Sequence, residues 1–220
     1  MRKATVIIII AAVLSLGLTG VVLGASYGGG TGEPNNPYQI ADVNDFQTLT
    51  VDPNNWDKSF ILTADIDLTG LTFTQAPIAS GTYTTSGFRG TMCAGIFDGN
   101  GHTISNVTIN QPSSDNLGLF GYIGDGSEIK NLELVDVNVI GRSFVGGLVG
   151  TNSRGTISNC YSSGIVNALG HYAGGLVGNN WEESVNNCHS SGTVSGNDCI
   201  GGLVGGNFGS MRNCYSIAAV

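Results

Sequence analysis

Two stretches of the chain are nearly identical: NCYSSGIVNALGHYAGGLVGNN at 159–180 and NCHSSGTVSGNDCIGGLVGGN at 187–207. The Gly-Leu-x-Gly phrase inside them also occurs upstream. Its leucines lie 29, 28 and 27 residues apart, at Leu119, Leu148, Leu176 and Leu203. Self-similarity with a period of about 20 to 50 residues is the signature of a repeat architecture, in which each unit packs on its neighbours. The repeat therefore decides the fold class.

The content of the period selects the kind of array. A period of about 28 residues is too short for a four-stranded propeller blade or a helix pair. β-Branched residues occur in short runs separated by Gly, Asn and Ser, and no window keeps helical periodicity for three turns. Leucine-rich repeats need several leucines per unit, and this chain offers about one. We therefore predict an all-β fold, a right-handed parallel β-helix with coils of about 28 residues.

Stacking explains why the repeats are so similar. Equivalent residues of adjacent coils lie about 4.8 Å apart, so like side chains form columns. We expect the leucines named above to form a buried apolar column. We also expect a ladder of asparagines at a bend, buried and bonded along the stack, since Asn can pair with backbone groups that a turn leaves free. Its predicted members are Asn106, Asn131, Asn159, Asn187 and Asn213.

Two further columns follow the asparagines. Cys160, Cys188 and Cys214 recur in one position, and adjacent coils hold side chains farther apart than a disulfide prefers. We favour reduced, inward thiols that act as small apolar fillers, with a disulfide as the alternative. One residue further on, Tyr161, His189 and Tyr215 should point outward. These rings either stack on sugars or stack on one another.

The phrases resemble the bacterial GLUG-type repeat, which is named for its Gly-Leu-x-Gly core. Matching phrases lie at 147–150, 175–178 and 202–205, each in step with NCYS or NCHS. The upstream stretches PYQIADVNDFQTL and FRGTMCAGIFDGNGHTISNVTI are similar to the lead-in of such proteins. The resemblance implies a secreted or surface protein similar to filamentous adhesins. Such repeats also occur beside the peptidase domain of immunoglobulin-A-cleaving zinc proteases.

We divide the chain into four parts. Residues 1–25 have the charge, apolar core and small residues of a signal peptide, with an uncleaved membrane anchor as the alternative. Residues 26–37 are predicted to be a flexible lead-in. Residues 38–103 should form an N-terminal cap and the first coils, including a short capping helix that begins after Asp42. Residues 104–220 should form the GLUG-type β-helix repeats.

Composition and motifs limit the chemistry that we expect. The formal net charge of −8 disfavours nucleic-acid binding. The three histidines, His102, His171 and His189, form no zinc-peptidase motif. Asp65 and Asp67 share a strand face and are candidates for a glycosidase pair, but a solvated strand carboxylate is the commoner case. We therefore predict no catalytic residues, no metal site and no cofactor.

These observations favour a non-catalytic secreted or cell-surface module for adhesion or surface structure. A carbohydrate-active β-helix enzyme, either a polysaccharide lyase or a glycosidase, is the alternative. The expected partners are surface glycans or cell-surface proteins. The final coil stops at Val220, before a Gly-Leu-x-Gly strand of its own. We therefore expect either a piece of a longer array or end-to-end self-association through the open C-terminal coil.

Overall fold

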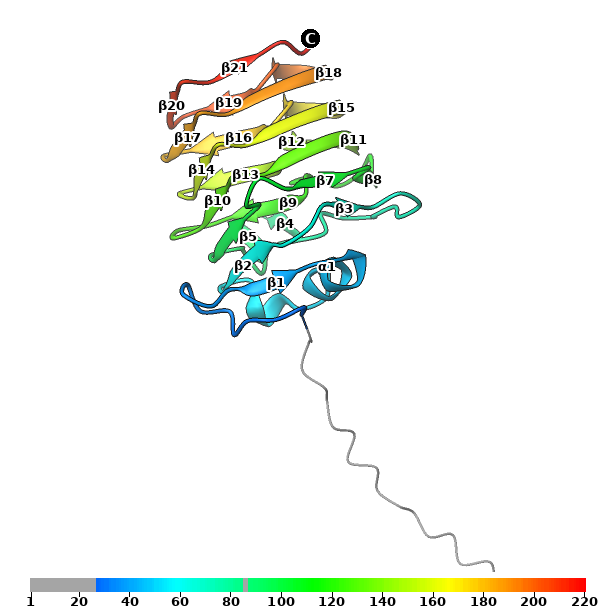
Figure 1. Ribbon diagram of the computed structural model, residues 1–220. Coiled ribbons are helices and arrows are strands. Elements are labelled where there is room, and N and C mark those ends of the chain that lie inside the picture. The colour runs from blue at the N-terminus through cyan, green and yellow to red at the C-terminus, as the bar shows by residue number, and fades with distance from the viewer. Residues whose placement is uncertain (1–26, 85–86) are drawn as a thin grey trace, which may run out of the picture.

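Three parallel sheets surround one apolar core in the computed structural model, which describes residues 27–84 and 87–220. Figure 1 shows the coils stacked one on another, with the only labelled helix at the N-terminal end and β21 at the opposite end. The predicted parallel β-helix is confirmed. The segment predicted to be a signal peptide, 1–25, lies outside the described residues.

Each sheet takes strands from successive coils. Sheet 1 runs β1 (Tyr38–Ile40), β2 (Ser59–Leu62), β6 (Ile96–Asp98), β10 (Glu128–Lys130), β14 (Thr156–Ser158), β17 (Ser184–Asn186) and β20 (Ser210–Arg212). Sheet 2 runs β3 (Ile66–Asp67), β7 (Thr103–Ser105), β11 (Glu133–Gly141), β15 (Tyr161–Gly174), β18 (His189–Gly201) and β21 (Tyr215–Ser216), with β8 (Thr108–Asn110) on β11 and β12 (Val145–Gly146) on β15. Sheet 3 runs β9 (Phe120–Ile123), β13 (Val149–Ser153), β16 (Val177–Trp181) and β19 (Val204–Asn207).

The strand register places the repeated phrases over one another. Val149 pairs with Phe120 and Val177, so the preceding leucines fall into one column as predicted. Leu119, Leu148 and Leu176 are fully buried, and Leu203 is 6% exposed in the last complete coil. Burying one such side chain contributes about 1.5 to 3 kcal/mol. Each of these repeats therefore contributes one buried leucine to the apolar core.

The cysteine column also points inward. Cys160 and Cys188 are buried, Cys214 is partly buried, and all are free thiols. Their sulfurs lie 3.1 to 3.2 Å from the carbonyl oxygens two residues earlier, those of Ser158, Asn186 and Arg212. The structure thus places these thiols on the inward side, as predicted, whereas their reduced state stays a prediction.

A helix covers the N-terminal end of the stack. Helix α1 (Val43–Thr50) begins where the Asp42 carboxylate accepts hydrogen bonds from the backbone amides of Asn44 and Asp45. Phe46 and Leu49 are buried on its inner face. A short 3₁₀ turn, η1 (Pro53–Asn55), follows it. The predicted capping helix is therefore present, and it covers strand edges that would otherwise be open.

The predicted flexible lead-in is held in place over its described part, 27–37. Gly28 donates to the carbonyl of Gln39, Gln39 donates to that of Gly29, and Ser59 donates to that of Gly32. The Tyr27 ring lies 4.5 Å from the Tyr38 ring, centroid to centroid. The expectation from the glycine-rich composition is corrected for this segment, because backbone pairing and an aromatic contact outweigh the local freedom of glycine.

A hairpin interrupts the coils between β3 and β6. It consists of β4 (Gly81–Thr84) and β5 (Gly87–Gly90), which pair in antiparallel fashion. Before it, single bridges join Phe73 to Ile109 and Ile78 to Phe120. The insertion therefore stays attached to the stack on its N-terminal side.

The predicted asparagine ladder exists with two corrections. Each amide nitrogen donates to the side-chain oxygen one coil earlier, over 3.0 to 3.2 Å, from Asn213 through Asn187 and Asn159 to Asn131. Asn159 and Asn187 are exposed rather than buried. The pairing of Thr103 with Glu133 places Asn106 outside the column. The side-chain amide of Asn106 donates to the Asp67 carboxylate instead. The ladder ends instead on the carboxylate of Asp98, 3.0 Å from the Asn131 amide.

The ladder residues share one backbone conformation. Asn131, Asn159, Asn187 and Asn213 all have φ between 51° and 53°. This left-handed region costs most L-residues about 1 to 2 kcal/mol, whereas Asn and Gly tolerate it. Asparagine thus satisfies both requirements of this corner, positive φ and a side chain that bonds along the stack.

A second asparagine column, which the sequence reasoning missed, is buried. Asn152 and Asn180 are fully buried, and the Asn152 amide donates to the Asn180 oxygen over 2.7 Å. Asn180 donates in turn to Asn207 over 2.8 Å. Asn152 also accepts from the amide of Gly155 and donates to its carbonyl, which closes the turn after β13. This column follows each Gly-Leu-x-Gly phrase and was visible in the repeat as VGTN, VGNN and VGGN.

The C-terminal coil is the exposed end of the stack. Tyr215, Ile217 and Val220 are 57%, 76% and 74% exposed, and the bridge between Thr193 and Ala219 keeps this segment in register. Whether this edge pairs with a second copy stays a prediction. Within 27–84 and 87–220, no helix has the length and apolar character needed to cross a membrane.

We expect Asn187→Leu to lower the free energy of unfolding by about 1 to 2 kcal/mol, because leucine is strained at φ 51° and loses the ladder bonds. Asn187→Gly should cost less, since glycine adopts this angle freely. Urea unfolding of both variants measures the difference. Equal losses would show that the backbone angle is not the main constraint at this corner.

Candidate functional site

The predicted ring column lies on sheet 2, and the structure brings its members together. The rings of Tyr161 and His189 stack with centroids 4.5 Å apart, and those of His189 and Tyr215 stack at 5.0 Å. The Tyr161 hydroxyl lies 2.6 Å from that of Ser191. Both faces of His189 are therefore covered by its neighbours. This arrangement matches rings that stack on one another, and sugar binding by the column stays a prediction.

A second group of rings surrounds a cavity that the sequence reasoning did not identify. The cavity has a volume of about 220 Å³ and is lined by Phe144, Thr151, Tyr172, Asn179 and Trp181. Phe144 and Tyr172 stack nearly parallel, 8° apart with centroids at 5.1 Å. Trp181 is 45% exposed and stacks on Phe208 at 4.5 Å. We call this hollow, with its five lining residues, the aromatic cavity.

Two walls of the aromatic cavity stand at a strained corner. Phe144 and Tyr172 have φ of 58° and 64°, in the left-handed region that bulky residues rarely adopt. Asn116 and Cys199 occupy the same corner in the neighbouring coils, with φ of 56° each. Residues held in this conformation cost about 1 to 3 kcal/mol each and cluster at ligand sites. The signal was present in the sequence as SFVGGLVG and HYAGGLVG.

The floor of the aromatic cavity is polar and comes from sheet 3. Thr151 and Asn179 are paired in register on β13 and β16. The Thr151 hydroxyl donates to the Asn116 side-chain oxygen over 2.7 Å. With its amide oriented to suit its neighbours, Asn179 accepts from the Trp181 indole nitrogen and donates to the carbonyl of Gly206 over 3.2 Å. The indole is therefore held in a fixed position above the sheet.

Glycine at position 206 allows the ring of Tyr172 to approach the sheet. A Cβ atom there would lie 2.6 Å from the Cδ1 atom of Tyr172 and 2.6 Å from the end of the Asn179 side-chain amide that faces Gly206. Such contacts are too short for carbon atoms in a folded protein. The small residue at Gly206 is thus required by the aromatic cavity, in addition to any demand of the backbone.

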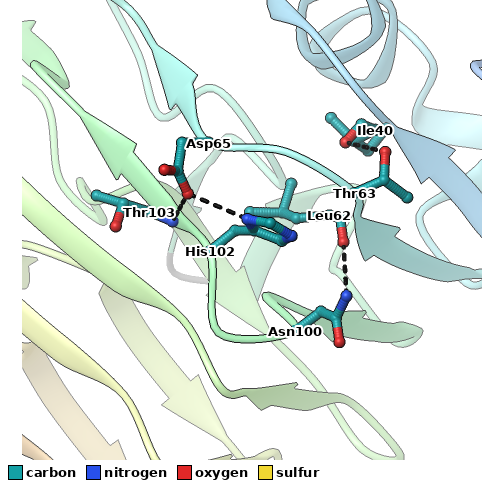
Figure 2. A network of polar contacts seen from close by, with 7 residues as sticks. All are labelled: Ile40, Leu62, Thr63, Asp65, Asn100, His102 and Thr103. Carbon is teal, nitrogen blue, oxygen red and sulfur yellow. Dashed lines mark hydrogen bonds and ion pairs between the residues drawn. The ribbon is translucent and has the colours of Figure 1, made fainter.

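The carboxylates that we considered for catalysis serve the turns. Figure 2 shows Asp65 beside His102 and Thr103, with Asn100 bonded to the carbonyl of Leu62. The Asp65 carboxylate accepts from the backbone amide of Thr103 at 2.9 Å and lies 3.1 Å from His102 Nδ1. The hydrogen bond from the Thr103 amide is the largest cause that lowers the pKa of Asp65, and the contact with His102 is the second.

Asp67 is engaged in the same way. Its carboxylate accepts from the hydroxyl of Thr69 at 2.7 Å and from the amide of Asn106 at 2.7 Å, and these two bonds are the largest causes that lower the pKa of Asp67. A glycosidase needs a general acid with a raised pKa opposite a second carboxylate. Two carboxylates with lowered pKa values do not fit that requirement.

Two of the buried thiols, those of Cys93 and Cys160, are not poised as nucleophiles. Burial raises the pKa of Cys93 to about 11 and also raises that of Cys160. A thiol must ionise before it attacks a substrate or binds a metal ion. Among the described residues, no group of three or more His, Cys, Asp or Glu side chains is placed to hold a metal ion.

The match to a known repeat is clearest in the coils that form the aromatic cavity. Residues 141–167, 170–195 and 196–220 match the family model of the GLUG motif. The chain carries three GLUG motifs. The predicted repeat region began at 104, and the coils before 141 still stack in register, as Ile129 on Ile157 shows. The three segments that match the GLUG motif therefore form the C-terminal part of the solenoid, and earlier coils of the same chain precede them.

Two proteins are similar to a larger part of the chain. Halomucin from Haloquadratum walsbyi (strain DSM 16790 / HBSQ001) is 35% identical over 154 residues, which cover 67% of this chain and 2% of halomucin. The crystal structure of a candidate immunoglobulin A1 protease from Bacteroides ovatus has a TM-score of 0.53 and 19% identity, covering 86% of this chain and 78% of the other. At that identity the likeness shows the fold alone.

The pH dependence of stability tests the role assigned to Asp67. Its pKa is lower in the folded chain than the ordinary value of about 3.9, so its contribution is complete above that value and is lost as the pH falls through the folded-state pKa. We expect Asp67→Asn to be less stable than the parent chain at about pH 6, with the gap shrinking towards about pH 2. Urea unfolding at both pH values measures it, and a constant gap would contradict this role.

Proposed function

We propose that this chain is a non-catalytic module of a secreted or cell-surface β-helix protein, and that it serves adhesion or surface structure. The proposal rests on the contacts that the repeated polar and aromatic side chains make with one another. The asparagine ladder, the buried asparagine column and the Tyr161 ring column all contact the equivalent residues of the next coil. Their first role is to continue the stack.

The comparisons support a modular role. The chain matches 2% of the length of halomucin, so the matched segment is a small part of a much longer relative. The name of the Bacteroides ovatus protein refers to a protease, and this chain has no His-Glu-x-x-His motif in its sequence. We therefore do not extend peptidase activity to this chain.

A glycan array and a reducing-sugar assay, run on the same preparation, test the proposal. We expect the chain to bind one or more glycans and to release no reducing ends from them during prolonged incubation. As a matched control, Asp65→Asn should leave the array profile unchanged, because this side chain serves a turn. Release of reducing ends that Asp65→Asn or Asp67→Asn abolishes would overturn the proposal in favour of a glycoside-cleaving enzyme.

A further inference from the structure

We propose that the aromatic cavity binds a pyranose ring of a neutral glycan, with Tyr172 and Trp181 as the principal contact residues. This inference rests on the proposed binding role, and it specifies both the site and the class of ligand. It concerns sheet 3 and the neighbouring corner, away from the Tyr161 column of sheet 2.

The walls present aromatic surface to a ligand. Trp181 is nearly half exposed, although its indole nitrogen is fixed by the Asn179 amide. The faces of aromatic rings carry partial negative charge. The C–H bonds on the face of a pyranose ring are weakly positive, so a sugar ring is attracted to an aromatic face. A rigid exposed indole loses little conformational entropy when it binds such a ring.

The floor retains hydrogen-bonding capacity for hydroxyl groups. The Thr151 hydroxyl donates to Asn116, which leaves its oxygen lone pairs as acceptors. Asn179 uses one N–H for Gly206, which leaves its second amide hydrogen and one oxygen lone pair. Apolar walls with a few polar groups at fixed positions are the usual composition of a small-ligand site. A sugar, with apolar faces and polar edges, matches this composition.

The charge of the site favours a neutral sugar over an acidic one. All five lining residues are uncharged, and the whole chain has a formal net charge of −8. Arg154 lines the adjoining cavity that shares Trp181, and its side chain is paired with Glu182 at 3.0 Å. An anionic sugar would therefore find no cation among the lining residues and would enter in the field of a negatively charged protein.

The volume fits one ring, with room for a second nearby. About 220 Å³ is below the roughly 300 to 1,000 Å³ of sites for drug-sized ligands. A second cavity of about 220 Å³ also includes Trp181 in its lining, together with Tyr122 and Ser153. Trp181 is thus shared by two adjoining hollows. This arrangement suits two successive rings of an oligosaccharide that runs along strands β13 and β16, across the stack of coils.

Tryptophan fluorescence provides a direct test, because Trp181 and the buried Trp56 are the only tryptophans in the chain. The purified chain is titrated with the neutral oligosaccharides cellohexaose and laminarihexaose, and separately with trigalacturonic acid and a decaproline peptide. We expect a saturable change with at least one neutral oligosaccharide and a weaker response to the acidic one. The change should be absent in Trp181→Phe.

The Tyr172→Asn variant removes one wall of the aromatic cavity without adding backbone strain. Asparagine already occupies the equivalent position in another coil, at Asn116, and it tolerates the positive φ found at both positions. We expect the dissociation constant, followed through Trp181, to rise at least about tenfold, since one of the stacking rings is lost. Tyr215→Ala, which removes an exposed ring from the sheet 2 column, should leave it unchanged. Thermal melting verifies that both variants are folded.

The remaining outcomes separate this inference from the proposed function. If the array still shows glycan binding and Tyr172→Asn and Trp181→Phe both retain it, the aromatic cavity is not the site, whereas the adhesive role stands. If the neutral oligosaccharides leave Trp181 unchanged up to millimolar concentration, or if decaproline or trigalacturonic acid binds more tightly, the inference is wrong. Release of reducing ends would instead overturn the proposed function.

Discussion

Every strand of sheets 1, 2 and 3 pairs in parallel with a strand of a neighbouring coil, and this pairing constrains each side chain to lie about 4.8 Å from its counterpart. A side chain that recurs in such a column must tolerate a neighbour of its own kind. Leucine packs on leucine, an aromatic ring stacks on a ring, and an asparagine amide can both donate to and accept from another. Like charges in one column would repel each other. The low share of charged residues, 11%, follows from this constraint.

The charges that are present follow the same logic. Arg142 binds Asp115 of the preceding coil, with Nε 2.7 Å from a carboxylate oxygen, and Arg154 binds Glu182 of the following one at 3.0 Å. His171 lies 3.1 Å from Asp198, again one coil away. In these three columns each charged or ionisable side chain is thus paired with a partner of opposite sign in a neighbouring coil. Individually such exposed pairs contribute little stability, but they remove the repulsion that would otherwise arise along the stack.

Two corners of the coils differ in how much their residues vary from one repeat to the next. At the ladder corner, asparagine combines a positive φ with bonds along the stack. At the corner of Asn116, Phe144, Tyr172 and Cys199, the same backbone conformation is imposed on unlike side chains. Two of these are rings that project over sheet 3 and wall the aromatic cavity. The fold thus tolerates strain at a position where exposed aromatic surface is gained.

Periodicity was sufficient to predict the fold, the leucine and cysteine columns and the capping helix, because these depend on spacing along the chain. It was insufficient for the direction in which corner residues point, since a residue with positive φ interrupts the regular alternation of side chains. Asn159 was therefore expected to be buried but is exposed, whereas the buried Asn152 was overlooked. Asn106 was misplaced because phrase similarity was used where only strand register could decide. Prediction of the aromatic cavity would have required both the backbone conformation at the corner and the strand register of sheet 3.

The central claim is that residues one repeat apart contact each other and stabilise the fold jointly. A double-mutant cycle on Asn152 and Asn180, which are 28 residues apart and share a 2.7 Å hydrogen bond, tests it most directly. The free energies of unfolding of the parent chain, Asn152→Ala, Asn180→Ala and the double variant are measured by urea unfolding. The stacked structure predicts an interaction energy of about 0.5 to 3 kcal/mol, as found for residues in contact. Additive losses, within about 0.3 kcal/mol, would contradict the stacking of these coils.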